Sequence, residues 1–323
     1  MSHGALAWRV CVVRAVSSAT ATTSVSAGVG RRGVKLCGRV VGGSNRRIAA
    51  SSSVDEERVT STDNATVKHF AKLVKSRTCR DEFGSVVVCG AGLLAEIYAT
   101  GAGGVPDAKV VFLGDDAAGL PNGMRALRVV RAPAHVLRKA SGLLNTDTVD
   151  VVAELATPPI EGIGAWGSVA LTATRILALD GIQDPGNLGT LTRTALALGW
   201  DAVALLPGTC DPFNDKALRA ARGGVFRLPI ARLSWDELGD FTSSRGMVRY
   251  CAEPYASGAV GADVAVHDAG KRGVCLVLGS EGKGLSDTAL RLCKPVSIPM
   301  PGEMESLNVA VAGGILMYLM RKC

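Results

Sequence analysis

The side chains best suited to chemistry are gathered in three glycine- and proline-containing stretches of the C-terminal half of the chain. The stretches span residues 180–193, 278–286 and 298–308. Their polar side chains belong to Asn187, Arg193, Glu281, Ser306 and Asn308. Apolar neighbours and open peptide groups at the glycines complete the usual composition of a small-molecule pocket. The sequence therefore predicts a pocket that holds its ligand largely through backbone groups.

The second stretch resembles a phosphate-binding loop only superficially. It is not a Walker A loop, because Lys283 precedes Gly284 and no Lys-Ser/Thr pair follows, and it lacks the G-x-G-x-x-G pattern. Glu281 at its centre would repel a phosphate, so a ligand with positive charge or hydrogen-bond donors fits better. An oxidoreductase of the ordinary dinucleotide-binding type is disfavoured because the fingerprint is missing.

The first stretch is a Gly/Pro turn that leads into a helix. Asn187 and Arg193 are six residues apart, which on a helix separates them by about 120° around the axis and about 9 Å along it. They can line one pocket without touching. The alternative interpretation makes Asn187 a plain N-cap and Arg193 a solvated arginine.

The elements that must position these stretches read as an α/β domain over residues 168–323. Strands are expected at 176–179, 202–206, 225–229, 247–251, 274–278 and 296–298, and helices at 187–198, 214–222, 286–292 and after the capping box Ser234-x-x-Glu237. The strands are continuous apolar runs, as a parallel sheet covered on both faces requires. Such a sheet binds its ligand at the carboxyl ends of its strands, where the three stretches fall.

The last helix is expected from Ser306 to Met320 and carries no charge before Arg321. A helix that is apolar on every side must be covered on every side. Its 15 uncharged residues are too few to span a bilayer, which takes roughly 20. We therefore expect protein to cover it, including a second copy of the same chain.

Residues 60–156 read as a smaller α/β domain, joined by a linker at 157–167 that contains Pro158-Pro159. Helices are expected at 65–75, 92–100 and 133–141, and strands at 85–89, 109–113, 127–130 and 149–154. Five basic residues lie on or just after the first helix: Lys68, Lys72, Lys75, Arg77 and Arg80. They form either a solvated helix face or a surface for RNA phosphates.

Residues 1–54 have the composition of an organelle transit peptide, with a disordered basic tail as the alternative. This leader holds eight basic residues and no acid, and its Ser/Thr/Ala/Val content favours a plastid over a mitochondrion. Without those eight, 28 basic residues face 29 acidic ones, so the net charge of +7 is a property of the leader. It gives no support to RNA binding. Nine scattered cysteines without a C-x-x-C pair predict neither a metal site nor a structural disulfide.

The three stretches together resemble the signature motifs of a known family. The motifs are Asn187-x-Gly189-x-x-x-Arg193-Thr194-Ala195, Gly279-x-Glu281-x-x-Gly284-Leu285 and Ile298-Pro299-Met300-x5-Ser306-Leu307-Asn308-Val309. They look like those of the TrmH/SpoU family of RNA 2′-O-ribose methyltransferases, and the resemblance covers about 168–323. Residues 60–156 resemble more loosely the family's RNA substrate-binding domain of the ribosomal-protein L30e type.

The resemblance implies an S-adenosylmethionine-dependent enzyme with a deep C-terminal trefoil knot that forms homodimers through its terminal helix. It implies a role for Arg193 at the ribose hydroxyl. A guanidinium almost never loses its proton, so we favour a cationic anchor over a base. Asn187 and Asn308 would orient Arg193 or the ribose, Glu281 would fix the site geometry, and Ser306 would donate or accept at the bend.

The cofactor positions implied by the resemblance are Leu278, Gly279, Gly284, Ile298, Met300 and Leu307. No metal and no membrane contact is expected. Organellar large-subunit rRNA is the expected substrate, and a tRNA ribose methyltransferase is the first alternative. A non-catalytic RNA-binding or ribosome-assembly factor on the same fold is the alternative of another class.

Overall fold

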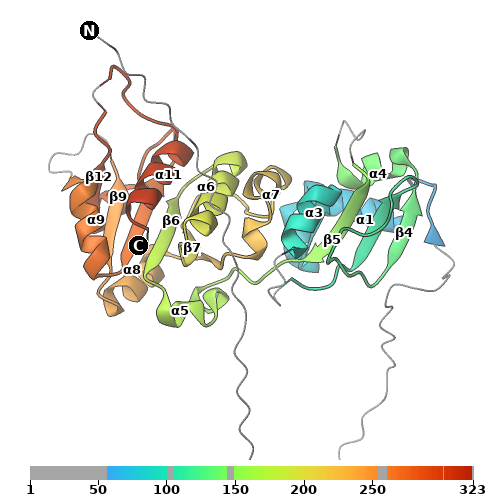
Figure 1. Ribbon diagram of the computed structural model, residues 1–323, viewed down its shortest axis with the longest axis horizontal. Coiled ribbons are helices and arrows are strands. Elements are labelled where there is room, and N and C mark those ends of the chain that lie inside the picture. Colours follow the sequence, from blue (N-terminus) through green and yellow to red (C-terminus); the bar gives the residue numbers. More distant parts are fainter. Residues whose placement is uncertain (1–56, 100–104, 144–148, 254–259, 301, 322–323) are drawn as a thin grey trace, which may run out of the picture. The chain divides into compact units, whose positions relative to one another are not determined.

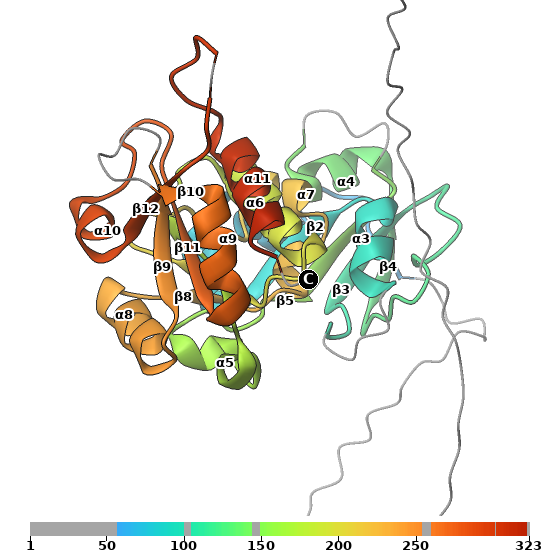
Figure 2. The ribbon, with the colours of Figure 1, turned by 60° about the vertical axis from the view of Figure 1, so that its left-hand side comes forward.

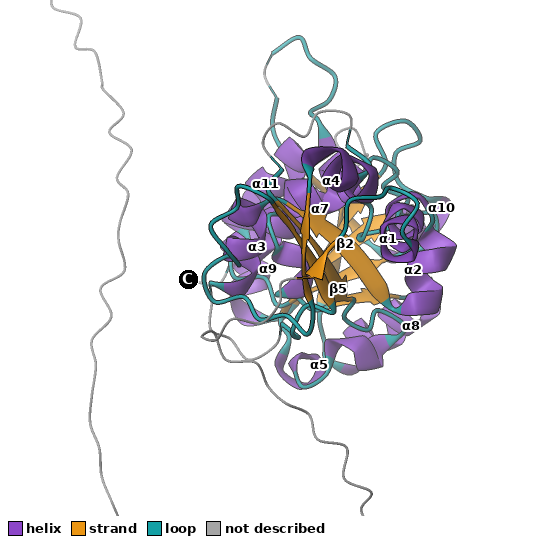
Figure 3. Ribbon diagram, turned by 90° about the vertical axis from the view of Figure 1, so that its right-hand side faces the viewer, coloured by secondary structure: helices purple, strands orange, loops and turns teal. Residues whose placement is uncertain are grey.

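The computed structural model describes residues 57–99, 105–143, 149–253, 260–300 and 302–321. The expected leader lies outside these residues. All of the described residues belong to one compact unit, in which the strands lie inside with the helices around them (Figure 3). No helix in the described ranges is long and apolar enough to cross a membrane.

The first half of the unit is a five-stranded sheet in the order β1-β4-β3-β5-β2 (Figure 1). The strands are β1 (Glu57–Arg58), β2 (Ser85–Cys89), β3 (Val110–Gly114), β4 (Val129–Ala132) and β5 (Val151–Ala156). The helices are α1 (Ala65–Lys75), α2 (Arg77–Phe83), α3 (Ala91–Tyr98) and α4 (Ala134–Ser141). Strand β5 runs antiparallel to both of its neighbours, whereas the other pairs are parallel. The helices and strands predicted for this half are confirmed within a few residues, and α2 and β1 are additional.

Alternation along the strands sends side chains into two separate cores. Val87 packs with α1 and α4 on one face of the sheet. Val86 and Val88 face the other way, in a cluster that includes Ile97 of α3 and continues into the second half of the unit at Leu218. Because side chains alternate along a strand, one sheet serves both cores. The two halves therefore share buried apolar surface.

The second half is a seven-stranded sheet in the order β10-β12-β9-β11-β6-β7-β8, and every strand pair is parallel. Its strands are β6 (Arg175–Asp180), β7 (Ala202–Leu205), β8 (Ile230–Arg232), β9 (Val248–Ala252), β10 (Val260–Gly261), β11 (Val274–Gly279) and β12 (Lys294–Ser297). Its helices are η1 (Ile163–Trp166), α5 (Val169–Thr172), α6 (Pro185–Ala197), α7 (Asp215–Ala221), η2 (Gly224–Phe226), α8 (Trp235–Ser244), α9 (Ala262–Lys271), α10 (Asp287–Leu292) and α11 (Val309–Leu319). The predicted α/β class with a mainly parallel sheet is confirmed.

Two predicted elements are wrong in their position. The strand expected at 225–229 is instead the 3-10 turn η2, followed by β8. Val225 and Leu228 are both buried, and this spacing of three is the period of a helical turn and not of a strand. The last helix begins at Val309 and not at Ser306, because Asn308 is its N-cap. Strand β10 and helix α9 lack a counterpart in the predicted elements.

The terminal helix α11 is anchored along one side and open along the other. It lies beside α6 (Figure 2). Near its carboxyl end the backbone carbonyl of Met320 accepts from Arg175 Nε at 2.7 Å, and that of Met317 accepts from Trp200 Nε1 at 3.2 Å, which satisfies carbonyls that a helix end leaves without partners. Four large apolar side chains remain exposed within this chain, namely Val311, Ile315, Tyr318 and Leu319. One chain therefore covers only part of the helix, and the expected cover by a second copy stays a prediction.

Candidate active site

A cavity of about 470 Å³ opens at the carboxyl ends of the adjacent strands β9, β11 and β12. Its walls come from the ends of these strands, the loop 280–285, the segment that follows β12, and the first turns of α11. The volume is within the usual range for small-molecule sites, about 300–1,000 Å³. The position at the carboxyl edge of a parallel sheet agrees with the prediction from strand order.

All six residues predicted to hold a cofactor line this cavity: Leu278, Gly279, Gly284, Ile298, Met300 and Leu307. Of the residues predicted to act in catalysis, Glu281, Ser306 and Asn308 line it as well. The structure therefore brings the second and third stretches together around one space. Their roles there stay a prediction.

A network of three side chains lies at the rim and links all three stretches. Asn187 Nδ2 donates to Glu281 Oε1, and Asn308 Nδ2 donates to Asn187 Oδ1 at 3.4 Å. Asn308 Oδ1 accepts the backbone N–H groups of Ala310 and Val311 at 2.9 and 3.4 Å. Asn187 thus reaches the site through Glu281 and Asn308, although it does not line the cavity itself.

The loop after β11 is a tight turn that folds back on the strand. Ser280 and Gly284 exchange two backbone hydrogen bonds of 3.0 and 2.9 Å, and Gly284 adopts a φ of +69°. A Cβ on Gly279 would stand 2.6 Å from the backbone of Gly284 and Leu285. Only glycine fits at this position, because the backbone of the loop itself occupies the space that a side chain would need.

The buried carboxylate of Asp180 was not predicted as a functional residue. It ends β6 directly opposite Gly279 in the sheet register, and its Oδ2 accepts the Ser286 N–H at 2.8 Å. It is only 5% exposed, and a buried carboxylate is costly unless it is hydrogen-bonded. Asp180 therefore ties the cavity loop to the neighbouring strand. The feature of the sequence that could have identified Asp180 is an acidic residue directly at the end of an apolar strand.

The helix that carries Asn187 is fixed at its start by Asp184. This N-cap accepts the Gly186 N–H and the Lys216 Nζ, both at 2.7 Å. The Lys216 ammonium, helped by the Gly186 N–H, lowers the pKa of the Asp184 carboxyl. One turn on, a Cβ at Gly189 would lie 2.4 Å from the Ala217 carbonyl oxygen, so this glycine permits α6 and α7 to touch.

Arg193, unlike Asn187, lies apart from both the cavity and the polar network at its rim. Its side chain is exposed on α6, and it is not among the residues that line the cavity. Its backbone lies beside η2, where a Cβ on Gly224 would stand 3.6 Å from Arg193 Cα. Within the described ranges, no group of three or more His, Cys, Asp or Glu side chains is placed to hold a metal ion.

Comparison with known proteins identifies the family. The family model of the SpoU rRNA methylases matches residues 174–318. A 23S rRNA (guanosine(2553)-2′-O)-methyltransferase of Bacillus subtilis is 36% identical over 182 residues, which are 56% of this chain and 68% of that protein. The chain belongs to the SpoU rRNA methylase family. The resemblance seen in the three motifs is thereby confirmed, and this SpoU-family chain is an RNA methyltransferase.

Two further relatives extend beyond the methylase segment. A mitochondrial rRNA methyltransferase 3A of Danio rerio is 26% identical over 306 residues, covering 81% of this SpoU-family chain and 69% of that protein. The crystal structure of an AdoMet-bound rRNA methyltransferase from Sinorhizobium meliloti is 26% identical, with a TM-score of 0.67 over 82% of this chain and 97% of that one. The likeness therefore includes the smaller sheet. Its resemblance to the L30e type stays a prediction, as does the knot.

Proposed function

We propose that this protein transfers a methyl group from S-adenosylmethionine to a ribose 2′-hydroxyl of ribosomal RNA. The observation that carries the proposal is the cavity at the carboxyl edge of the sheet, where the six predicted cofactor positions meet beneath a polar rim. Membership of the SpoU family supports it. The Bacillus subtilis relative is named as a 2′-O-methyltransferase of 23S rRNA, and the Sinorhizobium meliloti structure holds AdoMet.

The lining of the cavity fits this cofactor. Its two charged side chains, Glu253 and Glu281, are both acids, which suits a sulfonium cation and not a phosphate. Leu278, Ile298 and Leu307 offer apolar walls beside open backbone groups. When bound, the cofactor supplies an electrophilic methyl group. The chain's own residues bind it, exclude water around it and hold Glu281 in place through Asn187.

The ribose is proposed to approach over the side of α6 on which Arg193 is exposed. Methyl transfer would form a bond between O2′ and the methyl carbon and break the bond between that carbon and the sulfonium sulfur, which would leave as a neutral thioether. The hydroxyl proton would pass to water, and negative charge would develop on O2′ as it leaves. A guanidinium cannot take the proton, but it stabilises such charge and the adjacent phosphate. Asn308 and Ser306, at the start of α11, are proposed to orient the ribose.

A homodimer through α11 belongs to the proposal. The exposed side chains of Val311, Ile315, Tyr318 and Leu319 form a contiguous apolar side of this helix, and they are 37% to 53% exposed in one chain. Apolar surface of this kind marks an interaction site. A second copy of the chain presents the same surface, as two-fold symmetry requires.

We further propose an organellar location, with a plastid favoured. The acid-free leader and the mitochondrial relative from Danio rerio support it. Residues 1–60 fused to a fluorescent protein should enter plastids or mitochondria. A diffuse cytosolic signal would show that the leader is not a transit peptide.

The catalytic proposal is tested with tritiated S-adenosylmethionine, organellar rRNA and separate tRNA. Arg193→Ala should leave cofactor binding within a few-fold while methyl transfer to rRNA falls by about 10²–10³, the usual loss for one preorganised charge-stabilising group. Arg193→Lys should recover little because it lacks the planar fork. Near-normal transfer by Arg193→Ala would remove Arg193 from the mechanism. RNA binding by the wild type without any transfer would favour a non-catalytic assembly factor.

A further inference from the structure

We propose that Glu253 makes the cavity select the charged cofactor over its demethylated product, and that it is therefore a specificity-determining residue of the reaction. The inference rests on the proposed function, since it assumes that S-adenosylmethionine occupies the cavity. That cofactor carries a sulfonium cation, whereas S-adenosylhomocysteine, which is left after methyl transfer, has a neutral thioether in the same place. The two ligands differ by one methyl group and one positive charge, so a charged side chain is well suited to distinguish them.

Glu253 follows the end of β9, beside the strand that leads into the cavity loop. Strands β9 and β11 are parallel neighbours, and Cys251 lies opposite Val277 in their register. Continued by two residues, this register places Glu253 level with Gly279, where the cavity loop begins. On the other side, the Glu253 N–H donates to the Val296 carbonyl of β12 at 3.0 Å. The backbone of Glu253 is therefore held between two strands at the carboxyl edge of the sheet.

The charged side chains that line the cavity are both acidic. They belong to Glu253 and Glu281, and the other described residues of the lining are uncharged. Lys283, the basic residue of the loop after β11, is exposed and is not among the lining residues. The lining thus offers negative charge to a ligand. Such charge lowers the energy of a positively charged ligand and leaves that of a neutral one nearly unchanged.

The two acids differ in their surroundings, and this difference assigns most of the discrimination to Glu253. Glu281 is exposed and accepts a hydrogen bond from Asn187 at the rim. Glu253 is half-buried and lines the cavity together with Leu278 and Val296, which are both buried. Salt screens exposed charges strongly and partly buried ones much less. The Glu253 carboxylate is therefore expected to act more strongly than Glu281 on a charge inside the cavity.

Discrimination by charge has a consequence for turnover. Methyl transfer removes the positive charge of the ligand, while the acids of the cavity keep their negative charge. The product is then held less tightly than the cofactor and leaves more readily. Side chains that bind both ligands equally would lower KM without raising kcat, and they would retain the product, whose release often limits turnover.

A different role for Glu253 would be to hold a group that both ligands share. The ribose hydroxyls and the amino-acid ammonium are present in the cofactor and in the product, and a carboxylate can accept hydrogen bonds from either. Removal of Glu253 would then weaken both ligands equally. The ratio of the two affinities, and not either affinity alone, therefore distinguishes the two roles.

Calorimetry on the full chain measures this ratio with S-adenosylmethionine, S-adenosylhomocysteine and sinefungin, a cationic analogue in which a carbon bearing an amine replaces the methylated sulfur. The wild type should bind S-adenosylmethionine at least about 10-fold more tightly than S-adenosylhomocysteine, the lower end of what one opposite charge within about 4–6 Å does to the balance between the charged and neutral forms of a group. Glu253→Gln removes the charge with little change of shape. It should weaken S-adenosylmethionine and sinefungin about 10-fold and leave S-adenosylhomocysteine within about 2-fold. Glu253→Asp keeps the charge and should keep most of the ratio.

The matched control is Glu82→Gln, which removes the same charge from an exposed residue of α2 in the other half of the chain. This control should change none of the three affinities. Equal affinities of the wild type for cofactor and product would overturn the inference, and so would an equal loss of both in Glu253→Gln. A purely structural role would give that equal loss together with a lower melting temperature.

Failure of the inference and failure of the proposed function give different results. If the wild type binds S-adenosylmethionine and transfers its methyl group to RNA but does not prefer it over S-adenosylhomocysteine, the inference fails and the proposed function stands. If the wild type binds neither ligand, the proposed function itself fails.

Discussion

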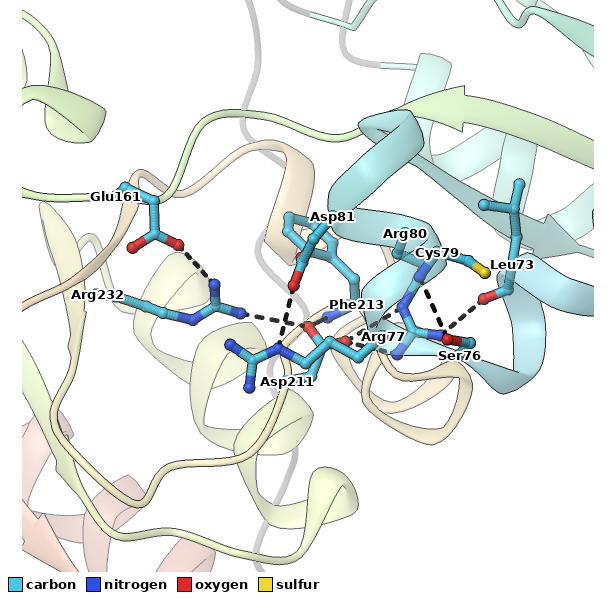
Figure 4. A network of polar contacts seen from close by, with 10 residues as sticks. All are labelled: Leu73, Ser76, Arg77, Cys79, Arg80, Asp81, Glu161, Asp211, Phe213 and Arg232. Carbon is cyan, nitrogen blue, oxygen red and sulfur yellow. Dashed lines mark hydrogen bonds and ion pairs between the residues drawn. The ribbon is translucent and has the colours of Figure 1, made fainter.

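The ion pair between Arg80 and Asp211 joins the two halves of the described unit in a buried place. The two side chains are only 6% and 9% exposed, and Asp211 Oδ2 accepts from Arg80 Nη2 at 2.6 Å and from Nε at 3.1 Å. Asp211 Oδ1 also accepts the Phe213 N–H at 2.9 Å. The nearest other cation is Arg232, whose Nη2 lies 3.8 Å from Oδ1 without a hydrogen bond (Figure 4).

Arg80→Ala should leave the Asp211 carboxylate buried without its main partner. Removing one member of a buried pair costs about 3–5 kcal/mol. For a unit of this size, roughly 2–4 °C of melting temperature corresponds to each kcal/mol, so we expect a fall of about 6–20 °C. The two carbonyls at the end of α1 that Arg80 satisfies would lose their donor as well, which places the expectation toward the upper end.

The double-mutant cycle separates the pair from simple loss of packing. Arg80→Met/Asp211→Leu should recover most of the loss, because replacing both charges by apolar groups removes the buried unpaired ion. Arg77→Ala is the matched control, since its pair with Asp81 is 3.4 Å long and half exposed, and it should change stability by less than about 1 kcal/mol. Thermal unfolding followed by circular dichroism measures these three variants beside the wild type. If Arg80→Ala costs no more than Arg77→Ala, the bridge between the halves does not exist in solution.

Three further predictions concern the cavity, the terminal helix and the cysteines. Gly279→Ala should reduce S-adenosylmethionine binding at least 10-fold by calorimetry, because its Cβ would collide with the loop backbone at 2.6 Å. Gly282→Ala, whose Cβ would have nothing within 4 Å, should bind the cofactor normally, and equal effects of the two substitutions would contradict the loop geometry. Ile315→Glu should convert the dimer into a folded monomer, because Ile315 is 37% exposed in one chain and the new charge would be buried between the two chains of a dimer. Light scattering measures the change, and a wild type that is monomeric at micromolar concentration would refute the dimer. Burial raises the pKa of Cys89 and Cys275 to about 12, so their contribution to stability is present below about pH 8.5 and is lost as pH rises toward 12. Cys275→Ala should therefore flatten the fall in melting temperature above pH 9. A wild-type melting temperature that rises above pH 9 would show that these thiols do not destabilise the fold at high pH.

The periodicity of the sequence was sufficient to place most elements, because most of them follow local rules. Continuous apolar runs predicted β6, β7, β9 and β11, and the capping box at Ser234 predicted α8. The error at 225–229 arose because Val225 and Leu228 satisfy an apolar run equally well as a strand or as a turn. A strand and a turn differ in which of these residues are buried. The spacing of three between the buried residues is visible in the structure but not in the sequence.

The position of the candidate site was predictable from the motifs and the strand order. The contacts that the packing of loops and helices creates around the site were not. Strand ends placed Gly279, Glu281 and Asn308 at one edge of the sheet. The reason for Gly279, by contrast, is a close approach of its own loop, and the reason for Gly189 is contact between α6 and α7. Neither contact can be derived from spacing along the chain. Arg193 was expected near the cavity. Helix geometry gives its position around the axis of α6, but it does not tell which elements pack against that side of the helix.

The polar rim shows how a local rule can determine the chemistry of a site. Asn308 caps α11, so its Oδ1 is occupied by the Ala310 and Val311 N–H groups and only its amide nitrogen remains for other partners. That nitrogen must donate, which makes Asn187 Oδ1 an acceptor and turns the Asn187 amide nitrogen toward Glu281. The N-cap thereby sets the orientation of both amides. Glu281 therefore accepts a hydrogen bond from an amide that cannot turn its oxygen toward it, and an acidic side chain at the rim suits a positively charged methyl donor.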